Sequence, residues 1–247
     1  MQPSRIIMPM LFLLLLSTGD AAAGWRVEAE TGWVFPALND VRSPGTTGTF
    51  LSLVDDLHAP SAPYFRVQAV ASLGKKQSLR LMAAPLRLVS RGTLPRDTVF
   101  EGAFLPAGTP AEAYYRFDSY RATWRYSFRR SDSFEFAGGL TAKVRDAEIA
   151  LTGASSGVKT NTGFVPLLHI LLDWKPGAGK TGLLLEADAA AAPQGRAEDV
   201  LVALTRELRP GVSGRIGYRM LEGGADNPEV YTFAWLHYAV LGLSVDL

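Results

Sequence analysis

Long stretches of this sequence alternate between apolar and polar residues with a period of two. Over residues 120–128 every second residue is aromatic or alanine, and the residues between them are arginine, threonine or serine. The same alternation recurs over residues 69–83, 134–145 and 168–174. Because successive side chains of a strand point to opposite faces, this pattern predicts strands with one apolar and one polar face.

The length of these segments decides what kind of sheet they form. The strands expected around them run for 10 to 18 residues, whereas strands of water-soluble proteins average about 5 to 6 residues. Tilted strands of about 9 to 11 residues or more, apolar on one face, are typical of barrels whose apolar side chains contact lipid. The sequence therefore predicts an all-β fold, a transmembrane antiparallel up-and-down β-barrel, with apolar side chains outside and ions inside.

The start of the chain has the features of a secretory signal peptide. Arg5 precedes an apolar run over residues 6–16, and an A-x-A cleavage site ends at Ala23. The run is shorter than the roughly 20 residues that a membrane-spanning helix needs. We expect a cleaved signal peptide over residues 1–23 and one mature domain, the barrel, over residues 24–247.

Composition removes several classes of function. The chain has no cysteine, which excludes disulfides, thiolate metal sites and cysteine nucleophiles. Its 25 Lys+Arg against 24 Asp+Glu give a net charge of +1, which predicts no nucleic-acid partner. The acidic segment 222–227 lacks the spacing of a calcium loop. We expect no metal and no cofactor.

Connection lengths predict the number of strands. Outer-membrane barrels have short periplasmic turns and long outer loops. Strict alternation between the two kinds gives ten strands, with residues 25–35 as the first strand and 36–61 as the first outer loop. Twelve strands is the alternative, because residues 49–54 and 98–104 could also pair. The short connections lie at 74–76, 129–131, 175–180 and 209–211, and the long ones at 91–112, 152–161, 191–196 and 222–229.

Tight turns also predict the pairing between strands. If each short turn closes its hairpin directly, apolar residues face apolar residues, and a slip of one residue would mix the two faces. The expected pairs are Ala71 with Leu79, Leu204 with Ile216, and Trp124 with Phe136.

The C-terminal strand carries the most specific pattern. Its odd positions from Ala239 to Leu247 are all apolar, with Phe233 and Trp235 further up. This resembles the terminal strand of bacterial outer-membrane barrel proteins, although Leu247 stands where an aromatic residue is usual. The resemblance implies a small porin-like or OmpA-like barrel in the outer membrane of a Gram-negative bacterium. Its partners would be outer-membrane lipid, lipopolysaccharide and the barrel-assembly machinery.

Charged residues of both signs occupy the face expected to point inward. A narrow barrel leaves few such charges unpaired at low dielectric, so we expect a connected network that occludes the lumen. The network is expected to contain Arg121, Arg125, Glu135, Lys143, His169, Asp173, Glu186, Asp188, Arg215 and Arg219. The other inward positions are Arg26, Glu28, Glu30, Arg66, Gln68, Arg80, Arg116, Asp118, Arg145 and Asp199.

His169 is the inward histidine to test for chemistry. Pairing across residues 175–180 places it opposite Glu186, with Asp188 two residues further along. An imidazole beside a carboxylate can act as a general base. No inward serine accompanies it, so we favour structural pairing over catalysis.

A second group of charges is expected at the extracellular rim. It contains Arg145, Asp146, Glu148, Arg196, Glu222 and Asp226. Omptin proteases use acidic and histidine residues at such a rim, but no histidine accompanies this group. Lipid A deacylases carry a His-x-Ser pair, where this chain has His237 followed by Ala239. We favour a structural or ligand-contacting barrel; the alternatives are a narrow pore for small solutes and a lipid-modifying or proteolytic enzyme.

Overall fold

The computed structural model describes residues 24–193 and 195–247. The expected signal peptide, residues 1–23, lies outside the described residues. Among those described, no helix is both long enough and apolar enough to cross a membrane.

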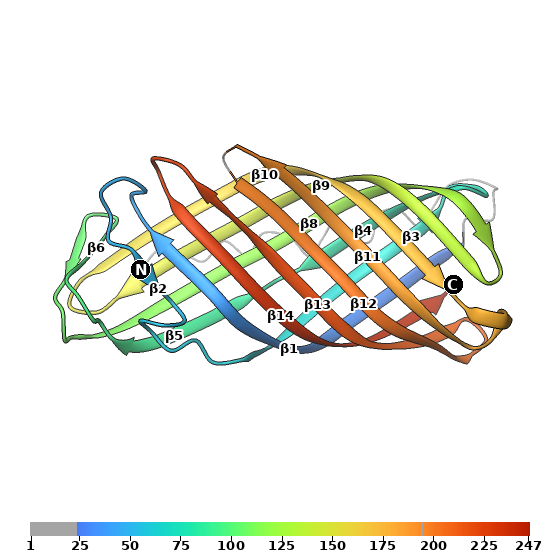
Figure 1. The fold of residues 1–247 in the computed structure, drawn as a ribbon, viewed down its shortest axis with the longest axis horizontal. Coiled ribbons are helices and arrows are strands. Elements are labelled where there is room, and N and C mark those ends of the chain that lie inside the picture. Colours follow the sequence, from blue (N-terminus) through green and yellow to red (C-terminus); the bar gives the residue numbers. More distant parts are fainter. Residues whose placement is uncertain (1–23, 194) are drawn as a thin grey trace.

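Ten wall strands form a closed antiparallel barrel (Figure 1). Closure comes from the pairing of the last strand with the first. One wall strand is interrupted at Pro85, and both of its parts pair with the same neighbour, β8. The wall strands are β1 (Trp25–Arg42), β3 (Ala62–Ser72), β4 (Gln77–Ala84) with β5 (Arg87–Thr93), β8 (Pro110–Ser131), β9 (Phe134–Thr152), β10 (Ser156–Trp174), β11 (Thr181–Ala192), β12 (Gly195–Arg209), β13 (Val212–Asp226) and β14 (Tyr231–Asp246).

The two extra segments considered in the sequence do form strands, but they do not widen the barrel. β2 (Leu51–Ser52) pairs with the end of β1. β6 (Thr98–Phe100) and β7 (Ala103–Leu105) pair with each other as a separate hairpin. The barrel of the described chain therefore has ten strands rather than twelve. A short 3-10 turn, Pro176–Ala178, lies between β10 and β11.

The two ends of the barrel differ in their connections. We call the end with the connections at 73–76, 132–133, 175–180 and 210–211 the turn end, and the opposite end the loop end. The expected outer loops are all shorter than predicted, because the wall strands extend further. For example, β9 continues to Thr152 and β10 begins at Ser156. Likewise β1 continues past a bulge between Pro36 and Leu38. The wall strands are therefore longer than the sequence predicted.

The expected register is confirmed in two hairpins. Ala71 faces Leu79, and Leu204 faces Ile216. In the third hairpin the expected pair is wrong, because Trp124 faces Leu140. A bulge between Ser127 and Arg129, together with the turn at residues 132–133, shifts the pairing by four residues. An even shift keeps every side chain on its face, so alternation alone does not reveal it.

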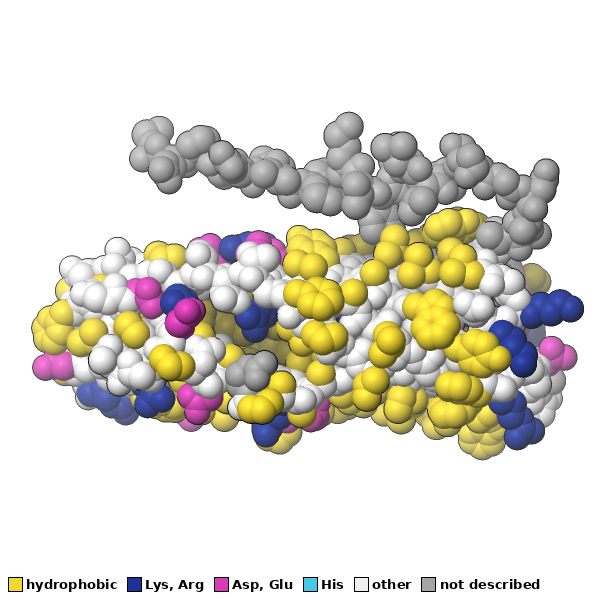
Figure 2. Space-filling view, turned by 90° about the horizontal axis from the view of Figure 1, so that it is seen from above, with side chains coloured by type: hydrophobic (Ala, Val, Ile, Leu, Met, Phe, Trp, Pro, Cys, Tyr) yellow, Lys and Arg dark blue, Asp and Glu magenta, His cyan; other side chains and the backbone are white. Residues whose placement is uncertain are grey.

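A belt of apolar side chains covers the outer surface of the turn half of the barrel. Figure 2 shows this belt as a dense apolar area beside a more polar area. Its most exposed members include Leu168 and Phe164, each 67% exposed, and Ile216, 61% exposed. Exposed apolar surface on this scale marks contact with another apolar phase.

Toward the loop end, apolar side chains occupy the inner face of the wall and charged side chains occupy the outer face. On β8 and β9 the change comes at the ladder pair Asp118 and Asp146. Beyond it, the inward Ile149 and Leu151 are buried apolar residues, and the outward Glu148 bonds Arg116. The expectation of inward ions is therefore wrong for this part of the wall, and so is the inward placement of Arg116 and Asp118. Where the outer surface carries charges, the apolar face packs inside, as in a soluble barrel.

Candidate functional site

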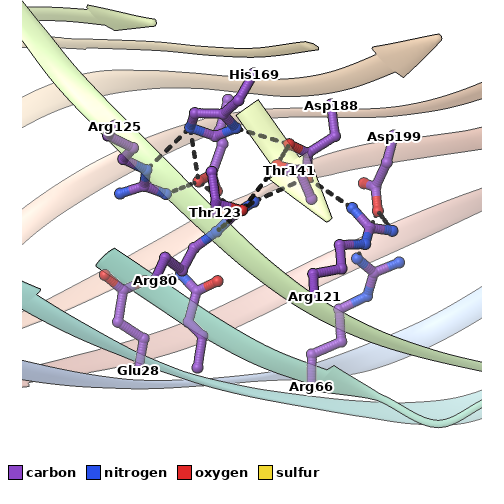
Figure 3. A network of polar contacts seen from close by, with 12 residues as sticks. Glu28, Arg66, Arg80, Arg121, Thr123, Arg125, Thr141, His169, Asp188 and Asp199 are labelled. Carbon is purple, nitrogen blue, oxygen red and sulfur yellow. Dashed lines mark hydrogen bonds and ion pairs between the residues drawn. The ribbon is translucent and has the colours of Figure 1, made fainter. Parts of the chain in front are cut away.

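The centre of the barrel contains a layer of paired charges. Figure 3 shows side chains from strands around the barrel converging on one another. Most of them are buried. We call this set the ionic layer; its members are Glu28, Glu30, Arg66, Arg80, Arg121, Arg125, His169, Glu186, Asp188, Asp199, Arg215 and Arg219.

Asp188 on β11 is the most highly connected carboxylate of the layer. Arg80 and Arg121 each donate a bond of 2.8 Å to its Oδ2. Thr141 Oγ1 and His169 Nδ1 each lie 2.8 Å from its Oδ1. Four donors from different strands thus satisfy one buried carboxylate, which is the condition for a charge to be tolerated at low dielectric.

His169 has both ring nitrogens engaged. Nδ1 faces Asp188, and Nε2 accepts a bond of 3.0 Å from Arg125 Nε. Because Arg125 can only donate, Nε2 carries the lone pair and Nδ1 carries the proton. The expected ladder partner was wrong by two residues, since Asp188 and not Glu186 faces His169. Glu186 lies 3.8 Å from Nε2.

This geometry leaves His169 without a free lone pair for proton abstraction. Glu186 is itself bound by Arg80 at 2.5 Å and by Arg125. A general base must reach the proton that it removes, and here the guanidinium of Arg125 fills that position.

A second cluster in the layer centres on Asp199 and Glu30. Asp199 accepts bonds from Arg66 at 2.8 Å, Arg121 at 2.6 Å and Arg219 at 2.6 Å. Arg219 also donates to both oxygens of Glu30, at 3.0 and 2.8 Å. Arg121 bonds Asp188 as well as Asp199, so the two clusters form one network.

The remaining contacts extend this network toward the turn end. Arg215 donates to Glu28 at 2.5 Å and to Glu30 at 3.0 Å. Gln68 adds a bond of 2.7 Å to Glu28. The ionic layer thus contains six arginines and five carboxylates, with a neutral histidine, so positive charge is in excess.

Three residues expected in the network lie outside it: Glu135, Asp173 and Lys143. Glu135 and Asp173 line a cavity of about 470 Å³ at the turn end. Ser127 Oγ donates to Glu135 at 2.5 Å, and Asp173 lies 3.8 Å from Lys175 Nζ. Both carboxylates are partly exposed, and neither contacts the central arginines.

Lys143 and Arg145, neighbours on the inward face of β9, have no carboxylate partner within 4.0 Å in the described chain. Lys143 is 4% exposed, and its Nζ lies 4.9 Å from the centre of the Phe117 ring. Arg145 donates to Asn161 Oδ1, and its buried Nε has no partner. These two cations are therefore distinct from the paired arginines of the ionic layer.

The expected rim residues do not form one cluster. On β9, Asp146 and Glu148 pair with Arg116 of β8 on the outer surface. Arg196 pairs with Glu222 on strands β12 and β13, elsewhere on the wall. Asp226 faces Tyr231 across the β13–β14 ladder, and Arg145 points inward.

A second interior layer lies at the loop end, and it was not predicted from the sequence. We call it the apolar layer. It combines wall residues such as Leu151 and Leu236 with side chains from the outer connections. Those from the connections are at most 1% exposed: Leu51, Leu53, Leu57, Leu94, Phe100 and Leu105. The signal that could have found the layer is the change of phase at residues 145–146, where apolar residues move from even to odd positions.

No group of three or more histidine, aspartate or glutamate side chains in the described residues is arranged to hold a metal ion.

Comparison with known proteins identifies the fold. No protein-family model and no curated protein match the sequence. The outer-membrane protease OmpT from Escherichia coli is structurally similar, with 9% identity and a TM-score of 0.56 over 94% of this chain and all of that one. The translocator domain of the autotransporter NalP from Neisseria meningitidis (14% identity, 94% and 90% covered) and OprG from Pseudomonas aeruginosa (12%, 93% and 98%) give lower TM-scores of 0.46 and 0.40. The chain has the fold of the small outer-membrane β-barrels.

Proposed function

We propose that this protein is an integral outer-membrane β-barrel with an occluded lumen and a structural or ligand-contacting role. In this proposal residues 1–23 direct export and are removed. The apolar belt contacts outer-membrane lipid, including lipopolysaccharide, and the barrel-assembly machinery inserts the chain.

The belt supports the membrane placement. Trp124, Trp174 and Trp235 are each more than 40% exposed on the outer surface, together with Leu168 and Ile216. Transferring apolar area out of water is favourable by about 25 cal/mol per Å². A continuous belt of this kind is therefore stable in lipid and prone to association in water.

The observation that carries the occluded lumen is the reach of the ionic layer across the barrel. Arg80 on β4 bonds Glu186 and Asp188 on β11. Arg66 on β3 bonds Asp199 on β12. Along the wall, three other strands separate each pair of bonded strands, so these side chains span the interior instead of following the wall.

The apolar layer supports the same conclusion independently. Leu57 and Phe100, from outer connections, are buried inside the loop end beside wall residues such as Leu236. An ion path would have to cross this apolar layer as well as separate the central charges. Each buried charge left without its partner would cost several kcal/mol, which favours the closed interior.

Conductance in planar lipid bilayers tests the occlusion. The refolded protein is expected to give no ion-conducting steps, while a porin inserted in the same way supplies the positive control. Regular conductance steps from the wild-type barrel would contradict the proposal.

Fluorescence quenching tests the membrane placement separately. In vesicles of phospholipids with brominated acyl chains, the outward tryptophans Trp124 and Trp235 should be strongly quenched, because bromine then lies in the phase that contacts the belt. A folded protein that stays in solution without detergent, with unquenched tryptophans, would show that the belt does not contact lipid.

A further inference from the structure

The barrel wall is incomplete on one side. β10 pairs with β9 along its whole length, from Ser156 to Trp174. Its pairing with β11 on the other side runs only from Leu168 opposite Ala189 to Trp174 opposite Leu183. Among the described residues, 159–167 of β10 therefore pair with no strand on that side. We call the opening between these residues and the β11–β12 tip (190–192 and 195–197) the wall notch.

The exposure of side chains on β10 agrees with this gap in the strand pairing. Asn161 occupies an inward position on β10 but is exposed, as are Thr160 and Thr162. Figure 2 shows a hollow in the surface between its apolar and more polar parts. Asn161, an inward side chain at this level, is thus reachable from outside through the wall.

The two unpaired cations lie at the level of the wall notch. In the β9–β10 ladder Lys143 faces Val165, and Arg145 faces Gly163. Both partners belong to the part of β10 without a β11 neighbour. Lys143 and Arg145 are two residues apart, so their side chains leave the same face of β9.

The protein supplies little negative charge to these cations. Among the groups whose charges act on Lys143 are Arg121, Arg145 and Arg66, with Asp199 as the carboxylate. Asp199 is already bonded by three arginines. A buried ammonium group without a counter-ion is unfavourable, so binding of an anion from outside the chain would favour the charged form of Lys143.

Arg145 is shaped to meet such an anion at the opening. Its guanidinium packs on Gly163, where a Cβ would approach Nη2 to 3.2 Å. Asn161 Oδ1 holds one side of the guanidinium, and the buried Nε remains without a partner in the described chain. The amide nitrogen of Asn161 adds a further donor. A guanidinium with free donors matches the several oxygens of a phosphate.

The position of the wall notch along the barrel, at the edge of the apolar belt, indicates the source of that phosphate. Arg145 faces Ser119 beside the pair Asp118 and Asp146, where the outer surface changes from apolar to charged. Just below, Phe164 and Leu168 offer exposed apolar surface. An amphiphile lying against the belt would therefore present its headgroup at the wall notch and its acyl chains to these two residues.

We propose that the wall notch binds the phosphate group of a membrane amphiphile, with Lys143 and Arg145 as the cations of the site. This inference deepens the proposed function and rests on its membrane placement only for the acyl-chain contacts. Asn161 is the third polar group of the site.

Calorimetric titration of the full-length barrel in an uncharged detergent tests the binding. The probes are dihexanoyl phosphatidic acid, dihexanoylglycerol, which lacks the phosphate, and inorganic phosphate. The wild type should bind phosphatidic acid saturably, and a double variant, Lys143→Met with Arg145→Gln, should bind it at least ~10-fold more weakly. The matched control, Lys75→Met with Arg129→Gln, changes two exposed cations at the turn end and should bind like the wild type.

The other probes separate the possible sources of the anion. Tight binding of phosphatidic acid with weak binding of inorganic phosphate would support a lipid headgroup. Equal binding of inorganic phosphate would support the cation site but reject the amphiphile. Equal binding of dihexanoylglycerol, or equal affinities of wild type and double variant for phosphatidic acid, would overturn the inference, as would no binding by the folded wild type.

Stability without ligand separates a binding role from a structural one. Lys143→Met removes a buried charge that has no carboxylate partner, so the urea midpoint of unfolding should stay unchanged or rise. A lower midpoint would show that Lys143 stabilises the barrel itself, and would overturn its assignment to the site. If the outward tryptophans are not quenched but phosphate still binds, the membrane placement is refuted and the cation site is retained.

Discussion

Replacing Asp188 by asparagine should strongly destabilise the barrel. The carboxylate accepts bonds from Arg80, Arg121, Thr141 and His169, all at 2.8 Å. Asparagine preserves the volume but removes the charge. Its amide nitrogen can only donate, so it would face side chains that are themselves donors.

The magnitude follows from burial. The side chains of Arg80 and Asp188 are each 3% exposed, and that of Arg121 is 1% exposed. Removing one partner of a buried ion pair costs about 3–5 kcal/mol, because the other charge stays buried without compensation. Arg80 and Arg121 retain Glu186 and Asp199 as second partners, so we expect the lower part of that range, about 3 kcal/mol.

Urea unfolding of the barrel in phospholipid vesicles, followed by tryptophan fluorescence, would measure this loss. The matched control is Asp246→Asn, because Asp246 also pairs with an arginine, Arg26, but the two side chains are 51% and 47% exposed. Exposed pairs contribute about 0–1 kcal/mol. If Asp188→Asn and Asp246→Asn shift the free energy of unfolding equally, burial of the network does not add to the stability of the barrel.

Three further changes test other parts of the structure. Leu168→Arg, in the apolar belt, should reduce the stability of the barrel in vesicles by up to about 2–4 kcal/mol. Glu148→Arg, beyond the belt, should change this stability much less. Equal losses of stability would contradict the position of the belt. Leu57→Ala in the apolar layer should cost about 2–5 kcal/mol and speed proteolysis of residues 43–61; unchanged cleavage would show that this connection is held by other contacts. Gly139→Ala should prevent normal folding, since a Cβ there would lie 1.9 Å from the carbonyl oxygen of Trp124; unaltered heat-modifiable gel mobility would refute this.

The local pattern was sufficient for the strands and, in the turn half of the barrel, for their faces. Alternation placed Trp124 outward and Arg121 inward, and the tight turns gave the pairs of Ala71 and Leu204. The pairings of Trp124 and of His169 were wrong by four and by two residues. Both errors are even, and an even slip exchanges no side chain between the faces, so no hydrophobic pattern can detect it.

The sequence was less informative about the ion-pair partner of a charged side chain than about the face of the strand that the side chain occupies. Arg66 bonds Asp199, which lies 133 positions further along the chain, and the pairing depends on barrel closure and on the stagger of the strands. The wall notch depends on the same stagger, because it arises where β11 turns away while β10 continues. Such features are set by the geometry of the whole barrel.

By itself, therefore, the sequence determined an antiparallel barrel with a belt of apolar side chains, because a period of two is a local property of each strand. The tertiary structure alone decided which arginine meets which carboxylate, and that the inward cations Lys143 and Arg145 have no carboxylate partner in the described part of the chain. The physical reason is that charges compensate one another through space, across a closed barrel whose opposite walls are far apart along the chain.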